Sequence, residues 1–200
     1  MILNTGSRTD IPAYYSEWFY NRIKEGYVYT RNPYNPKLIH SYQLNPSVVD
    51  ILVFCTKNPE PMMKRLDEIS HFKQFWGITL TAYGKDIEPN VLNKHRVIEC
   101  IKILSNRFGS KSVEWRYDPI FLSDKYTKEV HLRSFEYIAK ELSGSITTCV
   151  VSFIDLYQKT LKNFPSVKEV NLEDQIELIK AFVEIGTKYN IRIKTCLENK

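Results

Sequence analysis

The sequence lacks the features that mark several large classes of protein. It contains no apolar run near the roughly 18–20 residues that span a bilayer. The apolar residues 1–5 are too few for a signal-peptide core, and no basic segment precedes them. We therefore expect a cytoplasmic protein. Glycine is scarce, at 7 of 200 residues, and no glycine-rich dinucleotide, phosphate-loop or serine-nucleophile pattern occurs, which argues against those three kinds of site.

Metal-binding patterns are also missing. The four cysteines stand about fifty residues apart and include no Cys-x-x-Cys pair: Cys55, Cys100, Cys149 and Cys196. The four histidines have no ligand spacing such as His-Glu-x-x-His. The sequence therefore predicts neither a metal site nor a disulfide framework in this chain.

Charge of one sign is not concentrated anywhere. The chain has 28 basic and 23 acidic residues, a net charge of +5. Residues 1–100 carry 12 basic and 10 acidic groups, and residues 101–200 carry 16 and 13. A nucleic-acid binder usually shows a basic cluster, and this sequence has none. A nucleic-acid partner is therefore possible but has no basic patch to support it. A membrane partner is not expected.

What the sequence does contain is an alternation of short apolar runs and amphipathic segments. The runs predict strands at residues 1–5, 50–55, 75–81, 113–117, 148–154 and 191–196. The amphipathic segments predict helices at residues 10–25, after Asn58, and at 93–108, 127–142 and 171–189, the last striped by Ile176, Ile179, Phe182 and Val183. Six strands separated by helices of crossover length indicate one α/β domain, residues 1–200, with a largely parallel sheet. A turn-rich joint at residues 32–36 predicts an inserted β-hairpin near residues 27–44.

One strand favours a barrel over an open doubly wound sheet. Apolar and charged residues alternate strictly along residues 113–118, Val-Glu-Trp-Arg-Tyr-Asp. A parallel strand covered by helices on both faces would not carry three charges on one of them, whereas the lumen of a barrel accommodates such a face. We therefore expect a partial (β/α)6 TIM-like barrel. The alternative is an edge strand with one solvated face.

Polar residues follow the carboxyl end of every predicted strand, the end where parallel α/β folds bind ligands. The candidates for substrate or cofactor binding are Asn4, Arg8, Asp10, Lys57, Asn58, Thr81, Tyr83, Arg116, Tyr117 and Ser152, and the candidate catalytic acids are Asp118 and Asp155. Thr195 and Glu198 follow the last strand. Structural alternatives stay open, with Asp10 and Asn58 as helix caps, Lys57 as a solvated loop residue and Arg116 as the partner of a neighbouring carboxylate.

Five strings in fixed order carry a family resemblance: residues 4–13, 31–33 (Arg-Asn-Pro), 54–59 (Phe-Cys-Thr-Lys-Asn-Pro), 115–120 (Trp-Arg-Tyr-Asp-Pro-Ile) and 152–157 (Ser-Phe-Ile-Asp-Leu-Tyr). From residue 1 to about 198 the chain resembles an uncharacterised bacterial family, a domain of unknown function related to radical S-adenosylmethionine enzymes. The resemblance implies a partial barrel that holds a [4Fe-4S] cluster and S-adenosylmethionine at its mouth. Its cluster cysteines lie in a C-terminal segment that this chain lacks, and Cys55 stands where a tryptophan is expected. This chain alone is therefore expected to perform no radical chemistry.

Three hypotheses for function follow. The first is a radical S-adenosylmethionine-like barrel without its cluster segment, acting on an unknown small-molecule or nucleotide-containing substrate, with Arg8, Lys57, Arg116 and Asp118 as ligand contacts. The second is a non-catalytic module whose rim binds a phosphorylated ligand or a nucleic acid. The third is a cofactor-independent hydrolase or lyase that uses Asp118 and Asp155 as acid and base.

Overall fold

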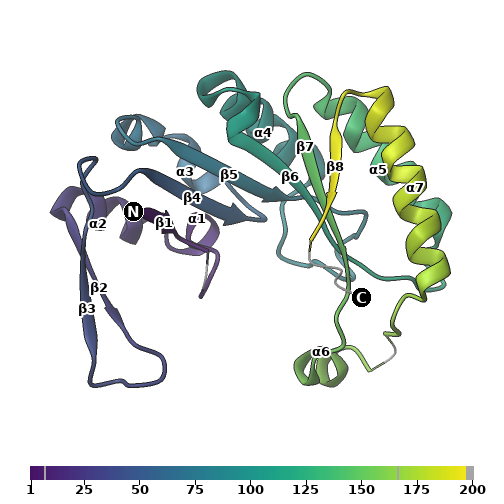
Figure 1. The fold of residues 1–200 in the computed structure, drawn as a ribbon, viewed down its shortest axis with the longest axis horizontal. Coiled ribbons are helices and arrows are strands. Elements are labelled where there is room, and N and C mark those ends of the chain that lie inside the picture. Colours follow the sequence, from purple (N-terminus) through teal and green to yellow (C-terminus); the bar gives the residue numbers. More distant parts are fainter. Residues whose placement is uncertain (7, 166, 197–200) are drawn as a thin grey trace. The chain divides into compact units, whose positions relative to one another are not determined.

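The fold is mixed α/β. The computed structural model describes residues 1–6, 8–165 and 167–196, in which six strands form a sheet of order β1-β4-β5-β6-β7-β8, flanked by helices (Figure 1). The strands are β1 (Ile2–Asn4), β4 (Ile51–Thr56), β5 (Gln74–Thr79), β6 (Val113–Ile120), β7 (Thr148–Phe153) and β8 (Arg192–Thr195). The pairs β1–β4, β6–β7 and β7–β8 are parallel, as predicted. Closure of the sheet into a barrel stays a prediction.

The chain divides into two compact units, residues 1–77 and 78–200, which are described separately. In the first unit the predicted helix at 10–25 is broken. Asp10 caps α1 (Ile11–Tyr14), the backbone leaves helical geometry at Tyr15 (φ −134°, ψ 24°), and α2 (Ser16–Glu25) follows. The break redirects the chain, and α2 buries Phe19, whose ring meets that of Phe54 edge-on at 5.4 Å. Glu198 lies outside the described residues.

The predicted hairpin is confirmed. β2 (Tyr27–Arg31) and β3 (Ile39–Gln43) pair antiparallel, from Tyr27 opposite Gln43 to Arg31 opposite Ile39. The helix predicted after Asn58 is split into α3 (Glu60–Met63) and a 3-10 helix (Leu66–Ile69). These short helices bury Met62, Leu66 and Ile69, while Phe54 stacks on Trp76 at 4.2 Å between ring centroids.

The second unit packs three long helices against one face of its strands. These are α4 (Lys94–Phe108), α5 (Lys128–Leu142) and α7 (Leu172–Lys188), and α5 and α7 run side by side in Figure 1. The alternation along β6 places Trp115 and Tyr117 in the core, where Trp115 stacks on Phe135 at 4.5 Å and Phe135 on Phe182 at 4.2 Å. The charged residues on the opposite face of β6 are half-buried: Glu114, Arg116 and Asp118.

Two details of the second unit differ from the predictions. The apolar stripe predicted on α7 is wrong for Ile176 and Val183, which are 44% and 45% exposed. The helix instead buries the row Leu178, Phe182 and Gly186, because residues four apart share a helix face. The short helix α6 (Gln158–Asn163) lies in a segment where no element was predicted, and a 3-10 turn (Ser110–Ser112) precedes β6.

No helix in the described ranges is both long and apolar enough to cross a membrane.

Candidate functional site

Predicted site residues of the first unit gather after β1 and β4, where they bond to the backbone. Asp10 accepts a hydrogen bond from Ala13 N at 3.0 Å through Oδ1 and from Lys57 N at 2.9 Å through Oδ2. The Asn58 side chain accepts from Glu60 N at 3.1 Å. Asn4 Oδ1 accepts from Gly6 N at 2.9 Å. These bonds give Asp10 the capping role left open above and join the loops that follow the two strands. Asn58 is not the cap of α3, because the N-cap position is Pro59.

Three predicted site residues of the second unit are buried. Thr81 donates to Glu88 Oε2 at 3.1 Å, and Tyr83 donates to Pro119 O at 3.0 Å while accepting from Phe121 N at 2.9 Å. Burial raises the pKa of the Tyr83 hydroxyl, an effect only partly offset by the Phe121 bond. Tyr117 is fully buried, and its hydroxyl bonds to His131 Nδ1 at 2.8 Å. All three hydroxyls are therefore bonded within the unit, and ligand binding by these residues stays a prediction.

His131 gives this core a pH dependence. Its Nε2 lies 3.0 Å from Phe121 O, a pure acceptor, so Nε2 carries the proton and Nδ1 accepts from Tyr117. Burial lowers the pKa of His131, and the Phe121 bond offsets this only in part. The unfolded chain, with an ordinary histidine pKa near 6.5, therefore binds a proton at a higher pH than the folded chain does.

We expect the free energy of unfolding to be highest above about pH 6.5 and to fall as the pH drops below that value, at up to about 1.4 kcal/mol per pH unit, until the folded form also becomes protonated. Urea unfolding between pH 8 and pH 5 measures this slope. The variant His131→Gln should show a smaller slope across the same window. Equal slopes in the two proteins would contradict the assignment.

The remaining predicted residues of the second unit lie away from its core. Arg116 Nη2 contacts Asp118 Oδ2 at 2.6 Å, with the two side chains 27% and 15% exposed. Ser152 is half-buried on β7. Asp155 is exposed and accepts from the Tyr157 hydroxyl at 3.0 Å. The two predicted catalytic acids thus have different partners, a guanidinium for Asp118 and a tyrosine for Asp155.

The Arg116–Asp118 pair should contribute to stability. The variant Arg116→Leu is expected to lose about 1–2 kcal/mol, because it leaves a mostly buried carboxylate without its cation. A double-mutant cycle with Asp118→Asn should give a coupling energy of about 1 kcal/mol by urea unfolding. The exposed pair Lys188–Glu136 is the matched control and should show no measurable coupling. Absence of coupling between Arg116 and Asp118 would contradict a structural ion pair.

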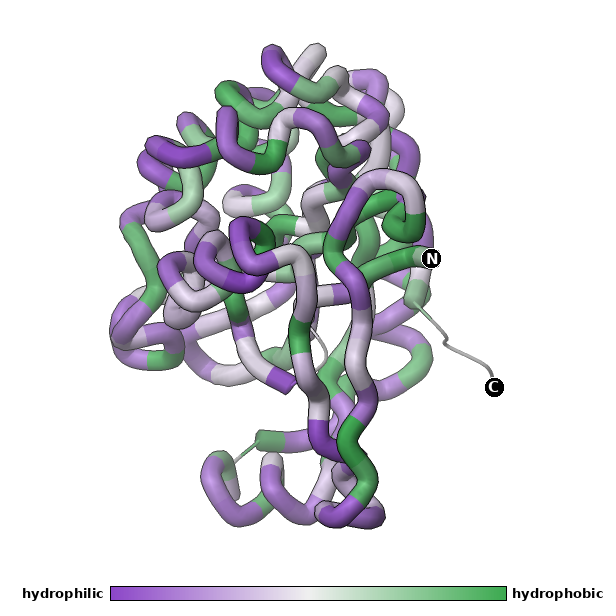
Figure 2. The backbone as a smooth tube through the Cα atoms, turned by 90° about the vertical axis from the view of Figure 1, so that its left-hand side faces the viewer, coloured by the Kyte–Doolittle hydropathy of each residue, from purple (hydrophilic) through white to green (hydrophobic). Residues whose placement is uncertain are grey.

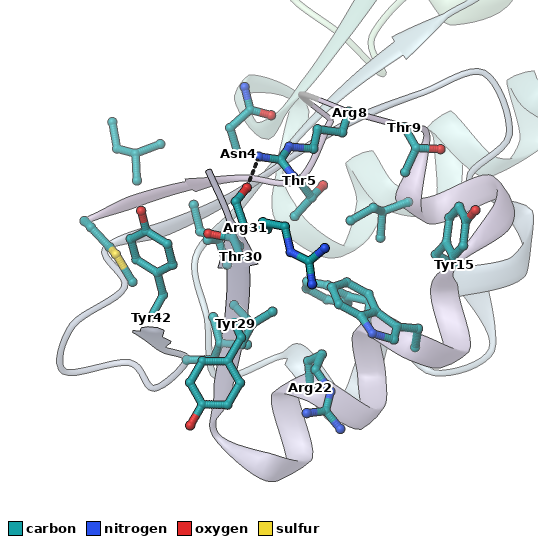
Figure 3. Close-up of a pocket in the computed structure, with 18 residues that line it drawn as sticks. Asn4, Thr5, Arg8, Thr9, Tyr15, Arg22, Tyr29, Thr30, Arg31 and Tyr42 are labelled. Atoms are coloured by element: carbon teal, nitrogen blue, oxygen red, sulfur yellow. Dashed lines mark hydrogen bonds between the residues drawn. The ribbon is translucent and has the colours of Figure 1, made fainter. Parts of the chain in front are cut away.

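A cavity in the first unit was not predicted. Its volume is about 710 Å³, and it is bounded by β1 and the following loop, α1, α2 and the hairpin (Figure 3). Of the predicted site residues, Asn4 and Arg8 line it. Three arginines line the cavity, and its described lining contains no aspartate or glutamate. Five aromatic side chains complete it: Tyr15, Trp18, Phe19, Tyr29 and Tyr42.

The arginines reach the cavity from three different segments. Arg8 Nη2 donates to the backbone oxygen of Arg31 at 2.6 Å, which ties the loop after β1 to the hairpin. Figure 3 shows Arg8, Arg31 and Arg22 at successive positions along the cavity, with Tyr15 and Tyr42 on opposite sides. Arg22 Nε is buried without a hydrogen-bond partner among the described residues. A buried donor of this kind is costly to leave unpaired. The Arg22 guanidinium lies 5.9 Å from the centroid of the Tyr27 ring.

This pocket was missed because its charges come from scattered positions. Arg8, Arg22 and Arg31 are separated by many residues and raise no local charge density in the sequence. One signal was present: no aspartate or glutamate occurs between Glu25 and Asp50. Hairpin folding turns that acid-free stretch into one wall of the cavity.

The described cysteines do not fit an iron–sulfur cluster. Cys100 on α4 and Cys149 on β7 are buried, and burial raises the pKa of both thiols, which opposes the thiolate form that a metal requires. Within the described ranges no group of three or more histidine, cysteine, aspartate or glutamate side chains is placed to hold a metal ion. A cluster therefore has no site among these residues.

Comparison with known proteins places the chain in a family without giving it an activity. A family model described as a domain of unknown function (DUF1848) matches residues 2–200. No curated protein matches the chain.

Proposed function

The chain belongs to the DUF1848 family over residues 2–200, and on that premise we propose that its first unit binds an anionic ligand with a planar ring, the chemistry of a nucleotide. The observation that carries the proposal is the cavity lined by three arginines and five aromatic side chains, with no carboxylate in its described lining. Its volume of about 710 Å³ lies within the usual range for small-molecule pockets.

The charge of the cavity favours phosphate. Cations that share a cavity without a counter-ion repel one another, and an anion relieves that repulsion. A guanidinium presents N–H donors in a fork that matches the oxygens of a phosphate. Arg22 Nε, buried and unpaired within the described structure, supplies a donor at one position of the cavity, and Arg8 lies at another.

The aromatic side chains favour a planar ring beside that phosphate. Trp18 is 44% exposed, Tyr15 50% and Tyr29 64%, so each keeps surface that a ligand could contact. Stacking of a nucleobase on aromatic side chains contributes about 1–3 kcal/mol per base and tolerates any base. A ligand that combines a phosphate with a base uses both features of the cavity, which inorganic phosphate does not.

Intrinsic fluorescence tests the proposal because the three tryptophans differ in exposure. Trp76 and Trp115 are fully buried, whereas Trp18 lines the cavity. Titration with AMP at 50 mM salt should change the emission saturably, and Trp18→Phe should abolish the change while calorimetry still detects binding. We expect adenosine and inorganic phosphate each to bind at least tenfold more weakly than AMP.

A matched pair of variants tests the role of Arg22. Arg22→Gln should weaken AMP binding at least tenfold and leave the melting temperature unchanged. Lys24→Gln, on the exposed side of the same helix, should leave AMP binding unchanged. Failure to detect any saturable fluorescence change or heat with millimolar AMP would overturn the proposal.

A finer proposal rests on the family resemblance alone. In this proposal the sheet is a partial (β/α)6 barrel of the radical S-adenosylmethionine type, and a [4Fe-4S] cluster and S-adenosylmethionine belong to a longer polypeptide that supplies the missing cysteines. The cysteines of this chain do not fit the cluster, so no reaction step is assigned to its residues. Iron analysis and ultraviolet–visible spectra of a C-terminally extended polypeptide after anaerobic reconstitution test this. Absence of both iron and S-adenosylmethionine binding would refute it.

A further inference from the structure

The hairpin that forms one wall of the cavity has four exposed tyrosines. Tyr29 is 64% exposed, Tyr34 97%, and Tyr27 and Tyr42 37% and 38%. We infer that the hairpin extends the cavity into a track for single-stranded nucleic acid, with one nucleotide in the cavity and its neighbours along β2 and the turn. This inference rests on the proposed function, because the cavity is one end of the track.

The strand geometry places rings and a cation in one row. Side chains two residues apart lie on the same face of a strand, so Tyr27, Tyr29 and Arg31 share a face of β2. The rings of Tyr27 and Tyr29 meet edge-on at 5.2 Å between centroids. Their partners on β3 include Gln43 and Ser41, which carry no charge. Arg31 lines the cavity at the end of this row.

The turn holds its aromatic ring outward. Asn32 Oδ1 accepts hydrogen bonds from Tyr34 N at 2.9 Å and from Asn35 N at 3.1 Å, and prolines at 33 and 36 restrict the backbone on both sides. Tyr34 thus projects from an ordered turn with almost its whole side chain in solvent. Ordering the backbone beforehand lowers the entropic cost of stacking a base on this ring.

The charge of the hairpin is complementary to a phosphate backbone. The 24 residues from Gly26 to Val49 contain Arg31 and Lys37 but no aspartate or glutamate. Along most of the hairpin the tube in Figure 2 is purple or pale, which marks hydrophilic and intermediate residues. Aromatic rings on a hydrophilic, acid-free arm suit a strand of bases and phosphates better than an apolar protein surface.

Fluorescence anisotropy with a 5′-labelled 12-residue oligothymidylate tests the inference. At 50 mM salt the oligomer should bind at least tenfold more tightly than thymidine monophosphate, because it contacts the hairpin as well as the cavity. Its affinity should fall about tenfold between 50 and 200 mM salt, as expected when a few phosphates are neutralised.

Variants at the turn separate the track from the cavity. Tyr34→Ala should weaken the oligomer about tenfold, the effect of one lost stacking contact, and should leave thymidine monophosphate unchanged. Tyr34→Phe should retain the oligomer affinity because the ring remains. The side chain is 97% exposed, so neither change should alter the melting temperature.

The possible outcomes separate the track proposal from the cavity proposal. If thymidine monophosphate binds but the oligomer binds no more tightly, or if Tyr34→Ala leaves oligomer affinity intact, the track is refuted and the cavity proposal stands. If neither ligand binds, both fail. Self-association by light scattering, or binding to anionic lipid vesicles, that is lost in Tyr34→Ala without any oligomer binding would assign the tyrosines to another partner and overturn the track.

Discussion

Replacing Arg31 with glutamate should weaken nucleotide binding by a factor of 100 or more. The change removes one of three cations from the cavity and puts a carboxylate beside the other two, Arg8 and Arg22. A phosphate then meets repulsion where it had a donor, and truncating one partner of such a charge pair costs about 2–5 kcal/mol. Calorimetry with AMP at 150 mM salt measures the loss.

The fold should survive this substitution. The hydrogen bond from Arg8 ends on the backbone oxygen of Arg31, which every side chain retains. Lys37→Glu is the matched control, since it makes the same charge change on the same hairpin at a residue that does not line the cavity. Lys37 is exposed, and salt at 150 mM screens charges on the surface. Lys37→Glu should therefore change AMP affinity less than threefold. Equal affinities for Arg31→Glu and the parent protein would exclude the cavity as the nucleotide site.

Hydrophobic periodicity predicted the strands well because each unit buries a continuous apolar layer. The run at residues 50–55 became β4, in which Leu52 and Phe54 are fully buried. The same alternation already set Tyr117 apart from Arg116, because neighbours on a strand point to opposite faces. Tyr117 lies with Trp115 in the core, so its position at a strand end was a weaker guide than its phase along the strand.

The candidate site was harder to predict because polar side chains at loop and strand ends have two uses. Asp10 and Asn58 satisfy backbone N–H groups that the helix starts would otherwise leave unpaired. Nothing in the residue types separates this use from ligand binding. The cavity, in turn, depends on the antiparallel return of β3, which places Tyr42 opposite Val28. Such long-range pairing leaves no mark in local composition.

Gly186 is another position where local rules and the structure disagree. An alanine inside a helix is ordinarily more stable than glycine by about 1 kcal/mol. At Gly186, however, an added Cβ would lie 2.5 Å from the backbone oxygen of Ile191 and 2.8 Å from Cδ1 of Ile193. Gly186 O also accepts from Ile191 N at 2.8 Å. The chain turns back from α7 into β8 directly over this glycine. The close contact between Gly186 and Ile191 is possible only because residue 186 has no side chain.

Gly186→Ala should therefore destabilise the protein by about 2–4 kcal/mol, because a backbone oxygen cannot move aside as a flexible side chain can, and α7 must shift from β8. Urea unfolding followed by circular dichroism measures the loss. Glu184→Ala, an exposed change on the same helix that also introduces alanine, is the control and should stay within about 0.5 kcal/mol of the parent. If Gly186→Ala were instead stabilising, helix propensity would outweigh the close approach, and the turn from α7 into β8 would have to be looser than its hydrogen bond indicates.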